Sequence, residues 1–282
     1  MNLPAEEDIQ HCRELTKRFA TNYYLATRFF PMEMRRATWI LYAFVRVPDE
    51  FVDTDHSRDL SVAREQLQHW KDAWRVAYAT GTSEDPVLRS TAWLFKHYSI
   101  PFAYSESFLS AMLMDTEKAR YATFAELDAY MEGSAQAVGL MMSHVIGFQP
   151  GALEYARALG DAFQLTNFLR DIREDYELRD RIYMPQDELA RFGLSDEDIK
   201  NHVVDDRWRN FMRFQIERAR EYYRQADRGI PMLHQAGQRA VRISRHLYAS
   251  ILTRIEENGY NVYAKRASTP MWKKLLIALK HF

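Results

Sequence analysis

"ATWILYAFVRVPDEFVD", residues 37–53, carries the pattern that decides the fold. Its apolar residues Trp39, Leu41 and Val45 recur at the spacing of an α-helix, and residues 209–225 follow a looser version of the same pattern. Only 10 glycines and 9 prolines interrupt the 282 residues, and no alternating run flanked by hairpin signals indicates a strand. We therefore predict an all-α chain whose long helices form a single domain over residues 1–282.

The composition of the chain excludes several classes of protein. Lys and Arg number 38 against 39 Asp and Glu, a balance that gives no sign of nucleic-acid binding. The single cysteine, Cys12, excludes an internal disulfide framework and fits a reducing compartment. The N-terminal sequence has no signal-peptide core, and no run approaches the ~18 apolar residues of a membrane span. We predict a cytoplasmic protein.

Acidic and hydrogen-bonding residues share one face of the helix predicted over residues 37–53. At 3.6 residues per turn, Tyr42, Arg46, Asp49 and Asp53 fall within an arc of roughly 60°. A second segment, "FQLTNFLRDIREDY" (163–176), repeats the arrangement about 120 residues later. Its polar face spans an arc of roughly 80° and contains Gln164, Asn167, Asp171 and Asp175.

The two polar faces together predict a metal and diphosphate site. Hard oxygen ligands of this kind suit Mg2+, with Mn2+ as a substitute, and Mg2+ completes its shell with water and phosphate oxygens. The alternative is a pair of solvated helix faces. The amides Gln164 and Asn167 and the apolar surroundings argue against it, because buried carboxylates need a cation nearby. A di-iron carboxylate bundle would need Glu-x-x-His pairs, and no histidine follows either acidic motif at that spacing.

Pro48 lies inside the first of these helices and cannot donate a backbone hydrogen bond to Phe44. One outcome is a kinked but continuing helix, which keeps Arg46 and Asp49 on one face. The other is a new helix that begins at Pro48 and places Asp49 in its first turn, where negative charge is favourable. We favour the continuing helix.

The chain resembles the phytoene/squalene synthase family of head-to-head prenyl transferases. Four segments carry the resemblance: "YAFVRVPDEFVDT" (42–54), "YMEGSAQAVGLMM" (130–142), "QLTNFLRDIREDYELRDRIYMP" (164–185) and "GYNVYAKRASTPMWKKL" (259–275). The resemblance implies the class I isoprenoid synthase fold, a single helical bundle around a deep central cavity.

The resemblance also implies roles for individual residues. The metal ligands would be Asp49, Asp53, Asn167, Asp171 and Asp175, of which the four aspartates count as catalytic. The substrate or diphosphate contacts would be Tyr23, Tyr42, Arg46, Ser134, Ala135, Val138, Gly139, Gln164, Asn167, Tyr183 and Tyr248. Tyr130 would lie near the developing cation and take part in proton removal. Near Tyr23 the chain departs from the family pattern, so contacts from residues 17–23 are not assigned further.

The implied reaction joins two prenyl diphosphates. One ionises to an allylic cation, the double bond of the other attacks it, and proton loss closes a cyclopropane. The cyclopropyl diphosphate then rearranges to the 1–1′ linkage. We expect two geranylgeranyl diphosphates to give phytoene without NADPH. The alternatives are a squalene or dehydrosqualene synthase that uses farnesyl diphosphate, a farnesyl diphosphatase, and, as a non-enzyme, a membrane-docking helical protein.

Two further segments each leave two interpretations open. One segment contains the small residues Gly133, Ser134, Ala135, Ala137 and Gly139. They either allow close helix packing or leave room for prenyl chains in a cavity wall. Residues 262–282 contain no acid and several lysines. Their last helix is predicted either to dock on the bundle or to contact an anionic membrane surface at the cytoplasmic face.

Overall fold

The computed structural model describes residues 3–19, 21–53, 60–270 and 277, and in this part of the chain helices are joined by loops. For residues 21–23 and 53 it describes the helical backbone but not the side chains. The helices are α1 (Glu6–Phe19), α2 (Thr21–Thr27), α3 (Met32–Asp53), α4 (Ser61–Thr80), α5 (Pro86–His97), α6 (Phe102–Met114), α7 (Phe124–Met131), the π-helical turn η1 (Glu132–Gln136), α8 (Ala137–Ile146), α9 (Ala152–Arg179), α10 (Gln186–Arg191), α11 (Asp196–Lys200), α12 (Asp206–Gly229), the 3-10 turn η2 (Ile230–Met232) and α13 (Gln235–Glu257). These residues include no strand, which confirms the all-α prediction.

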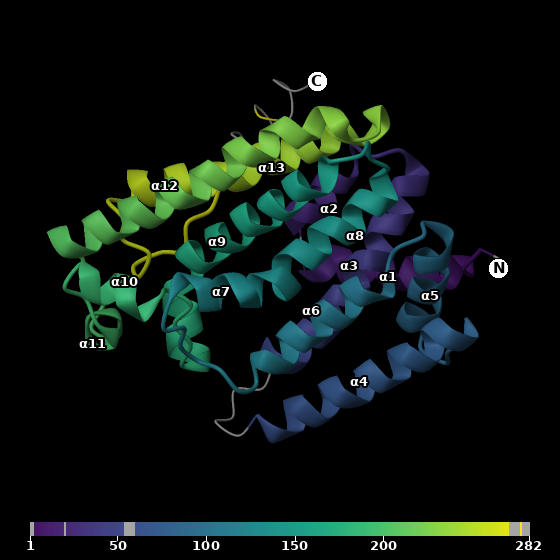
Figure 1. Ribbon diagram of the computed structural model, residues 1–282, viewed down its shortest axis with the longest axis horizontal. Helices are drawn as coiled ribbons and strands as arrows, with labels where there is room; N and C mark the ends of the chain where they lie inside the picture. Colours follow the sequence, from purple (N-terminus) through teal and green to yellow (C-terminus); the bar gives the residue numbers. More distant parts are fainter. Residues whose placement is uncertain (1–2, 20, 54–59, 271–276, 278–282) are drawn as a thin grey trace.

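Helix α9 runs through the bundle and packs against α12, α13, α8 and η1 (Figure 1). It begins after Gly151, whose φ of 87° lies in the left-handed region that glycine adopts without strain. It ends at Arg179, and the next residue, Asp180, is also in the left-handed region. Because neighbours surround α9, its polar face, from Gln164 to Asp175, is turned toward other helices.

Helix α3 is anchored by aromatic packing. The ring of Phe44 is fully buried and lies 4.8 Å from Trp74 of α4 and 6.1 Å from Phe95 of α5. Trp74 also donates a hydrogen bond from Nε1 to Ser105 Oγ of α6, at 2.9 Å. Aromatic pairs of this kind contribute roughly 1 kcal/mol each beyond the area that they bury. The cluster fixes α3 on a face away from Arg46.

Helix α3 continues through Pro48 as far as Asp53. The alternative in which Pro48 begins a new helix is therefore wrong. Arg46 and Asp49 remain on one helix, and the Arg46 guanidinium contacts the carboxylates of Asp49 and Glu50 on the next turn.

Small residues bring η1, α8 and α9 into close contact. An ideal Cβ on Gly139 would lie 2.6 Å from the carbonyl oxygen of Ala156, and one on Gly160 would lie 2.6 Å from that of Ala135. Neither position could accept even a methyl group without moving a backbone. The close-packing interpretation of the small residues is therefore confirmed.

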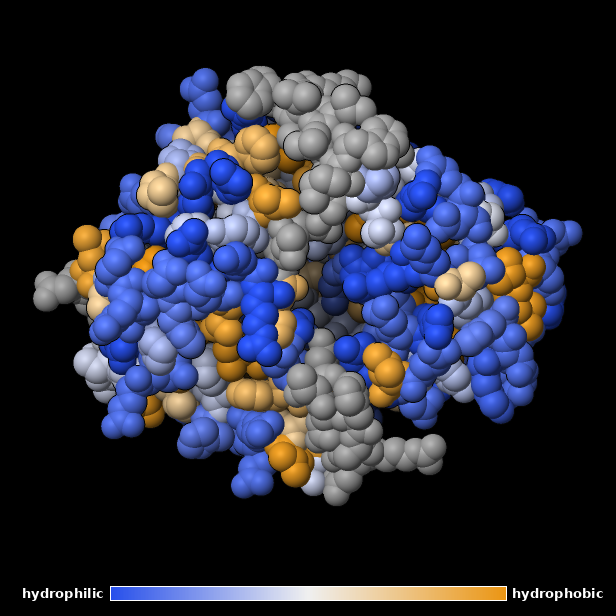
Figure 2. Space-filling model, turned by 180° about the vertical axis from the view of Figure 1, so that it is seen from behind, coloured by the Kyte–Doolittle hydropathy of each residue, from blue (hydrophilic) through white to orange (hydrophobic). Residues whose placement is uncertain are grey.

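The surface is mainly hydrophilic on the face shown in Figure 2, where a hollow opens near the centre. The large apolar side chains most exposed to solvent are spread over several segments: Leu3, Met32, Val62, Val76 and Leu178. Within the described ranges, none of the helices has the length and apolar content to cross a bilayer.

Candidate active site

A cavity of about 730 Å³ lies between α3, α6, the α7–α8 segment, α9 and α13. The predicted site residues on its wall are Tyr42, Arg46, Asp49, Tyr130, Ser134, Ala135, Val138, Gly139, Gln164, Asn167, Asp171, Asp175, Tyr183 and Tyr248. They come from segments as far apart in sequence as α3 and α13, and the fold brings them to one space. The side chains of Tyr23 and Asp53, which were also predicted, lie outside the described residues.

The cavity wall is partly apolar and partly ionic. Its apolar lining includes Leu41, Val45, Phe108, Met112, Met142, Ile146, Leu159 and Phe163, and its ionic lining includes Arg46, Asp49, Arg170, Asp171, Glu174, Asp175, Arg179 and Arg266. Ala135 and Gly139 line the cavity as well as packing closely. That they leave room there for prenyl chains stays a prediction. A pocket of this size and composition suits a ligand with a charged head and a long apolar tail.

The acidic face of α9 is enclosed and paired with arginines. Asp171 and Asp175 expose only 14% and 13% of their side chains, so the solvated-face interpretation is wrong for α9. Arg266 donates from Nε and Nη2 to the two carboxylate oxygens of Asp171, at 2.7 and 2.9 Å. Arg170 contacts the same carboxylate, and Arg179 lies 3.2 Å from Asp175.

These ion pairs govern the ionisation of Asp171. Burial alone would raise the pKa of Asp171, but the hydrogen bonds from Arg170 and Arg266 outweigh it and lower the pKa below its usual value. The carboxylate therefore stays charged in an enclosed site. On α3, burial raises the pKa of Tyr42, so its phenol stays protonated one turn before Arg46.

The donor set at the ionic end fits a hard divalent cation. The side-chain oxygen of Asn167 is buried and has no hydrogen-bond partner, although its amide nitrogen is 3.5 Å from Gln164 Oε1. This orphaned oxygen lies one turn before Asp171 on the same helix face. Among the described residues, no three acidic, histidine or cysteine side chains gather closely enough to hold a metal by themselves. A cation here would take ligands from both helices and complete its shell with diphosphate oxygens.

Sequence reasoning missed several charged residues that the structure places on the cavity wall, among them Asp115, Arg170, Arg181 and Arg266. Arg266 stands 95 residues from Asp171, so no helical spacing relates the two. Asp115 directly follows the apolar run "AMLM" (111–114) and is 6% exposed. An acid directly after such a run is the signal that could have found it, because a buried carboxylate needs partners.

Comparison with known proteins agrees with this geometry. The family model for squalene/phytoene synthases matches residues 16–273. The 15-cis-phytoene synthase of Synechococcus elongatus is 38% identical over 95% of this chain and 90% of its own. The 15-cis-phytoene synthase of a Synechocystis species is 40% identical over 96% of this chain and 83% of its own.

Solved structures share the fold. A dehydrosqualene synthase superposes with a TM-score of 0.90 over 98% of this chain and 95% of its own, at 22% identity. The squalene synthase HpnC of Alicyclobacillus acidocaldarius gives 0.81 over 90% of this chain and 95% of its own, at 25% identity. The predicted helical bundle around a central cavity is thus confirmed. With a family match over most of its length, the chain belongs to the squalene/phytoene synthase family of head-to-head prenyl transferases.

Proposed function

We propose that the protein condenses two molecules of geranylgeranyl diphosphate, through a cyclopropyl diphosphate, to phytoene. The observation that carries the proposal is the meeting of two aspartate-bearing helix faces, from α3 and α9, on the wall of one largely apolar cavity. The ionic part suits two diphosphates and the apolar part suits two prenyl chains. The names of the bacterial relatives favour phytoene as the product.

In this proposal, Asp49, Asn167, Asp171 and Asp175 hold the divalent metal. We propose Mg2+, for which Mn2+ would substitute because both prefer hard oxygen ligands. When bound, the metal would neutralise the diphosphate charge that otherwise opposes its departure. Asp53 belongs to the same proposed set on the evidence of its spacing from Asp49.

The arginines of the site would bind diphosphate oxygens. Arg46, Arg170 and Arg266 already stand beside the carboxylates of α3 and α9. When a metal cation coordinates one of these carboxylates, the neighbouring guanidinium would be released to donate hydrogen bonds to a phosphate. The planar donor geometry of a guanidinium is well suited to phosphate oxygens. The proposed binding role of Gln164 and Tyr42 rests on their places on the same wall.

The apolar walls would protect and steer the carbocations. Phe168, Tyr130 and Tyr183 present aromatic rings at the cavity, and ring faces attract cations. Ser134, Ala135, Val138, Gly139 and Tyr248 would line the paths of the prenyl chains. Exclusion of water matters here because an allylic cation reacts with any water that reaches it. Tyr130 would accept the proton that is lost when the cyclopropane closes.

Product analysis tests the proposal. Purified protein with Mg2+ would be incubated with the C15 or the C20 diphosphate, with and without NADPH, and the extracts analysed by mass spectrometry. Phytoene from the C20 donor, without a requirement for NADPH, is the expected result. A C30 hydrocarbon formed only from the C15 donor would instead assign a squalene or dehydrosqualene synthase. Release of diphosphate with only prenyl alcohol as the organic product would assign a diphosphatase.

We also propose that the enzyme works in the cytoplasm at an anionic membrane surface. The hydrocarbon product is insoluble in water, and the end of the chain is rich in lysine: Lys273, Lys274 and Lys280. These three lysines lie outside the described residues, so the support comes from the sequence.

A further inference from the structure

A buried carboxylate joins two tyrosines at the cavity wall. Asp115 follows the last residue of α6 and is 6% exposed. Its Oδ2 accepts a hydrogen bond from the hydroxyl of Tyr130 at 2.6 Å, and its Oδ1 accepts one from the hydroxyl of Tyr183 at 3.1 Å. All three side chains line the cavity.

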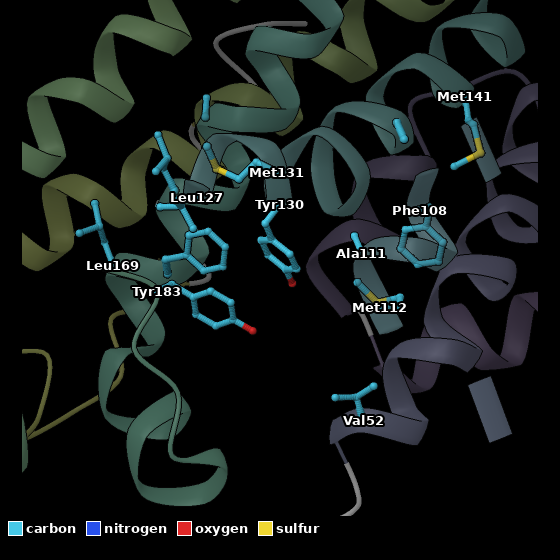
Figure 3. Close-up of a cluster of buried hydrophobic side chains, with 14 of the residues drawn as sticks. Val52, Phe108, Ala111, Met112, Leu127, Tyr130, Met131, Met141, Leu169 and Tyr183 are labelled. Carbon is cyan, nitrogen blue, oxygen red and sulfur yellow. The ribbon is translucent and has the colours of Figure 1, made fainter. Parts of the chain in front are cut away.

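These hydrogen bonds determine what the tyrosines offer to a substrate. A phenol carries one hydrogen, and both phenols use theirs on Asp115. Each phenol oxygen can therefore act toward other groups only as an acceptor, and that of Tyr183 already has the Arg181 guanidinium as a donor beside it. Figure 3 shows the two hydroxyl groups pointing toward the same region, which is where both reach the Asp115 carboxylate. Burial, followed by the charge of Asp115, raises the pKa of both phenols well above the ordinary value, so both stay protonated at neutral pH.

The surrounding structure holds this arrangement in place. The ring of Tyr183 stacks on Phe168, with centroids 4.2 Å apart, and lies 5.6 Å from the ring of Tyr130. The guanidinium of Arg181, which is also buried, donates from Nη2 to the carbonyl oxygen of Asp115 at 2.7 Å. The "RIYMP" segment (181–185) thus supplies both a partner and an anchor for Asp115.

Backbone hydrogen bonds tie the same two segments together. The amide of Ile182 donates to the carbonyl of Ala119 at 2.9 Å, and the amide of Gln186 donates to that of Tyr121 at 2.9 Å. The loop after α6 and the loop after α9 are therefore joined into one unit, which includes Asp115 and Tyr183. A donor–acceptor pair at 2.6 Å on such a support is already at the distance that proton transfer needs.

We propose that Asp115 is the final proton acceptor of a relay through Tyr130, an inference that rests on the proposed function. As the cyclopropane closes, the substrate C–H bond breaks and its electron pair forms the ring bond. The proton passes to Tyr130 Oη while the phenolic hydrogen passes to Asp115 Oδ2. Tyr130 stays neutral and Asp115 becomes a carboxylic acid. The proton then returns through Tyr130 to the diphosphate that the reaction releases.

The competing arrangement is direct transfer of the proton to the departing diphosphate. In that case the phenolic hydrogen never moves, and Asp115 only holds two rings in position. The two arrangements differ in whether a solvent-exchangeable hydrogen, that of the Tyr130 hydroxyl, is transferred while the cyclopropane closes.

The test measures the single-turnover rate of cyclopropyl diphosphate formation in H2O and in D2O, after exchange of the protein in D2O. The relay predicts a rate that is slower in D2O for the wild type and insensitive to D2O in Tyr130→Phe. Asp115→Asn, which keeps the shape of the side chain but cannot accept a proton, should slow the step by about a hundredfold. It should leave unchanged the binding of an unreactive prenyl thiodiphosphate.

A double variant separates relay from packing. If Asp115 acts through Tyr130, Asp115→Asn adds nothing to the defect of Tyr130→Phe. Tyr183→Phe is the matched control, since it loses the other hydrogen bond to Asp115 and should keep the isotope effect.

Three outcomes are decisive. No solvent isotope effect in active wild-type enzyme would overturn the relay alone, even if Asp115→Asn failed to fold. The relay would also be overturned if the rate losses of Asp115→Asn and Tyr130→Phe multiplied in the double variant. Wild-type enzyme that forms no cyclopropyl diphosphate from either donor would overturn the proposed function and the relay with it.

Discussion

Arg266 and Asp171 form a two-pronged ion pair across 95 residues of sequence, with both carboxylate oxygens engaged at 2.7 and 2.9 Å. The pair joins the segment after α13 to the acidic face of α9. It also means that Asp171 has a counter-charge before any metal arrives. A cation and Arg266 therefore compete for one carboxylate, and this competition can be measured.

We expect Arg266→Gln to lower the melting temperature of the metal-free protein. The carboxylate of Asp171 would lose one of its two guanidinium partners, and breaking an enclosed pair leaves a poorly compensated charge. Added Mg2+ should narrow the difference from the wild type, since the cation would supply the missing charge. Thermal unfolding with and without Mg2+ measures both effects. Arg254→Gln, which removes an exposed pair with Glu257, is the control and should show no dependence on metal.

An equal loss of stability with and without Mg2+ would mean that the metal does not reach Asp171.

Asp49→Asn and Asp171→Asn should each reduce turnover by at least about a hundredfold while leaving the fold intact. Each substitution removes a metal-directed charge and almost no volume. Turnover at limiting Mg2+ and circular dichroism are the measurements. Asp206→Asn, at a side chain that is 94% exposed, is the control and should behave as the wild type. Near-normal activity in either site variant would refute the assignment of these acidic faces to the metal.

The buried carboxyl of Asp161 should make stability depend on pH. Burial raises its pKa to about 7, against the lowering effect of a hydrogen bond from Gln136 Nε2 at 3.0 Å. The folded protein therefore binds this proton more tightly than the unfolded chain, and this contribution to stability falls as pH rises from about 4 to 7. A difference of one in pKa corresponds to about 1.4 kcal/mol, so the whole effect is at most about 4 kcal/mol.

Asp161→Asn removes the charge but keeps an oxygen for Gln136. Between pH 5 and pH 8, the melting temperature of Asp161→Asn should rise relative to that of the wild type. Thermal unfolding in matched buffers measures this difference. A difference that stays constant over this range would show that Asp161 does not titrate there. Asp206→Asn again serves as the control, because its exposed carboxyl has no such environment.

The lysines at the end of the chain should bind the protein to anionic liposomes in a salt-sensitive manner. Replacing Lys273, Lys274 and Lys280 by glutamine should weaken this binding, because each lysine near an anionic surface contributes roughly 1 kcal/mol. Flotation at low and high salt, with neutral liposomes as the control, is the measurement. Equal partition of the wild type and the triple variant at low salt would leave product release to another route.

Helical periodicity was enough to predict which residues share a helix face. Gln164, Asn167, Asp171 and Asp175 follow the 3.6-residue period of a helix, and this local geometry needs no knowledge of the rest of the chain. The scarcity of glycine and proline likewise predicted long helices. The same period could not decide whether the helix continues through Pro48 or a new helix begins there, because both arrangements satisfy it. The packing of α3 against its neighbours decided that question.

Which charges meet, and which hydroxyls share a partner, depends on how the helices pack. Asp115 lies 15 residues from Tyr130 and 68 from Tyr183, and Arg266 lies far from Asp171, so no periodic spacing relates them. Such pairs depend on the order in which helices pack and on the loops that join them. The cost of burying a carboxylate without a partner explains why each of these acids has found one. The spacing of residues along a helix shows which side chains lie on the same face. The packing of the other segments against that face then determines which partners those side chains contact.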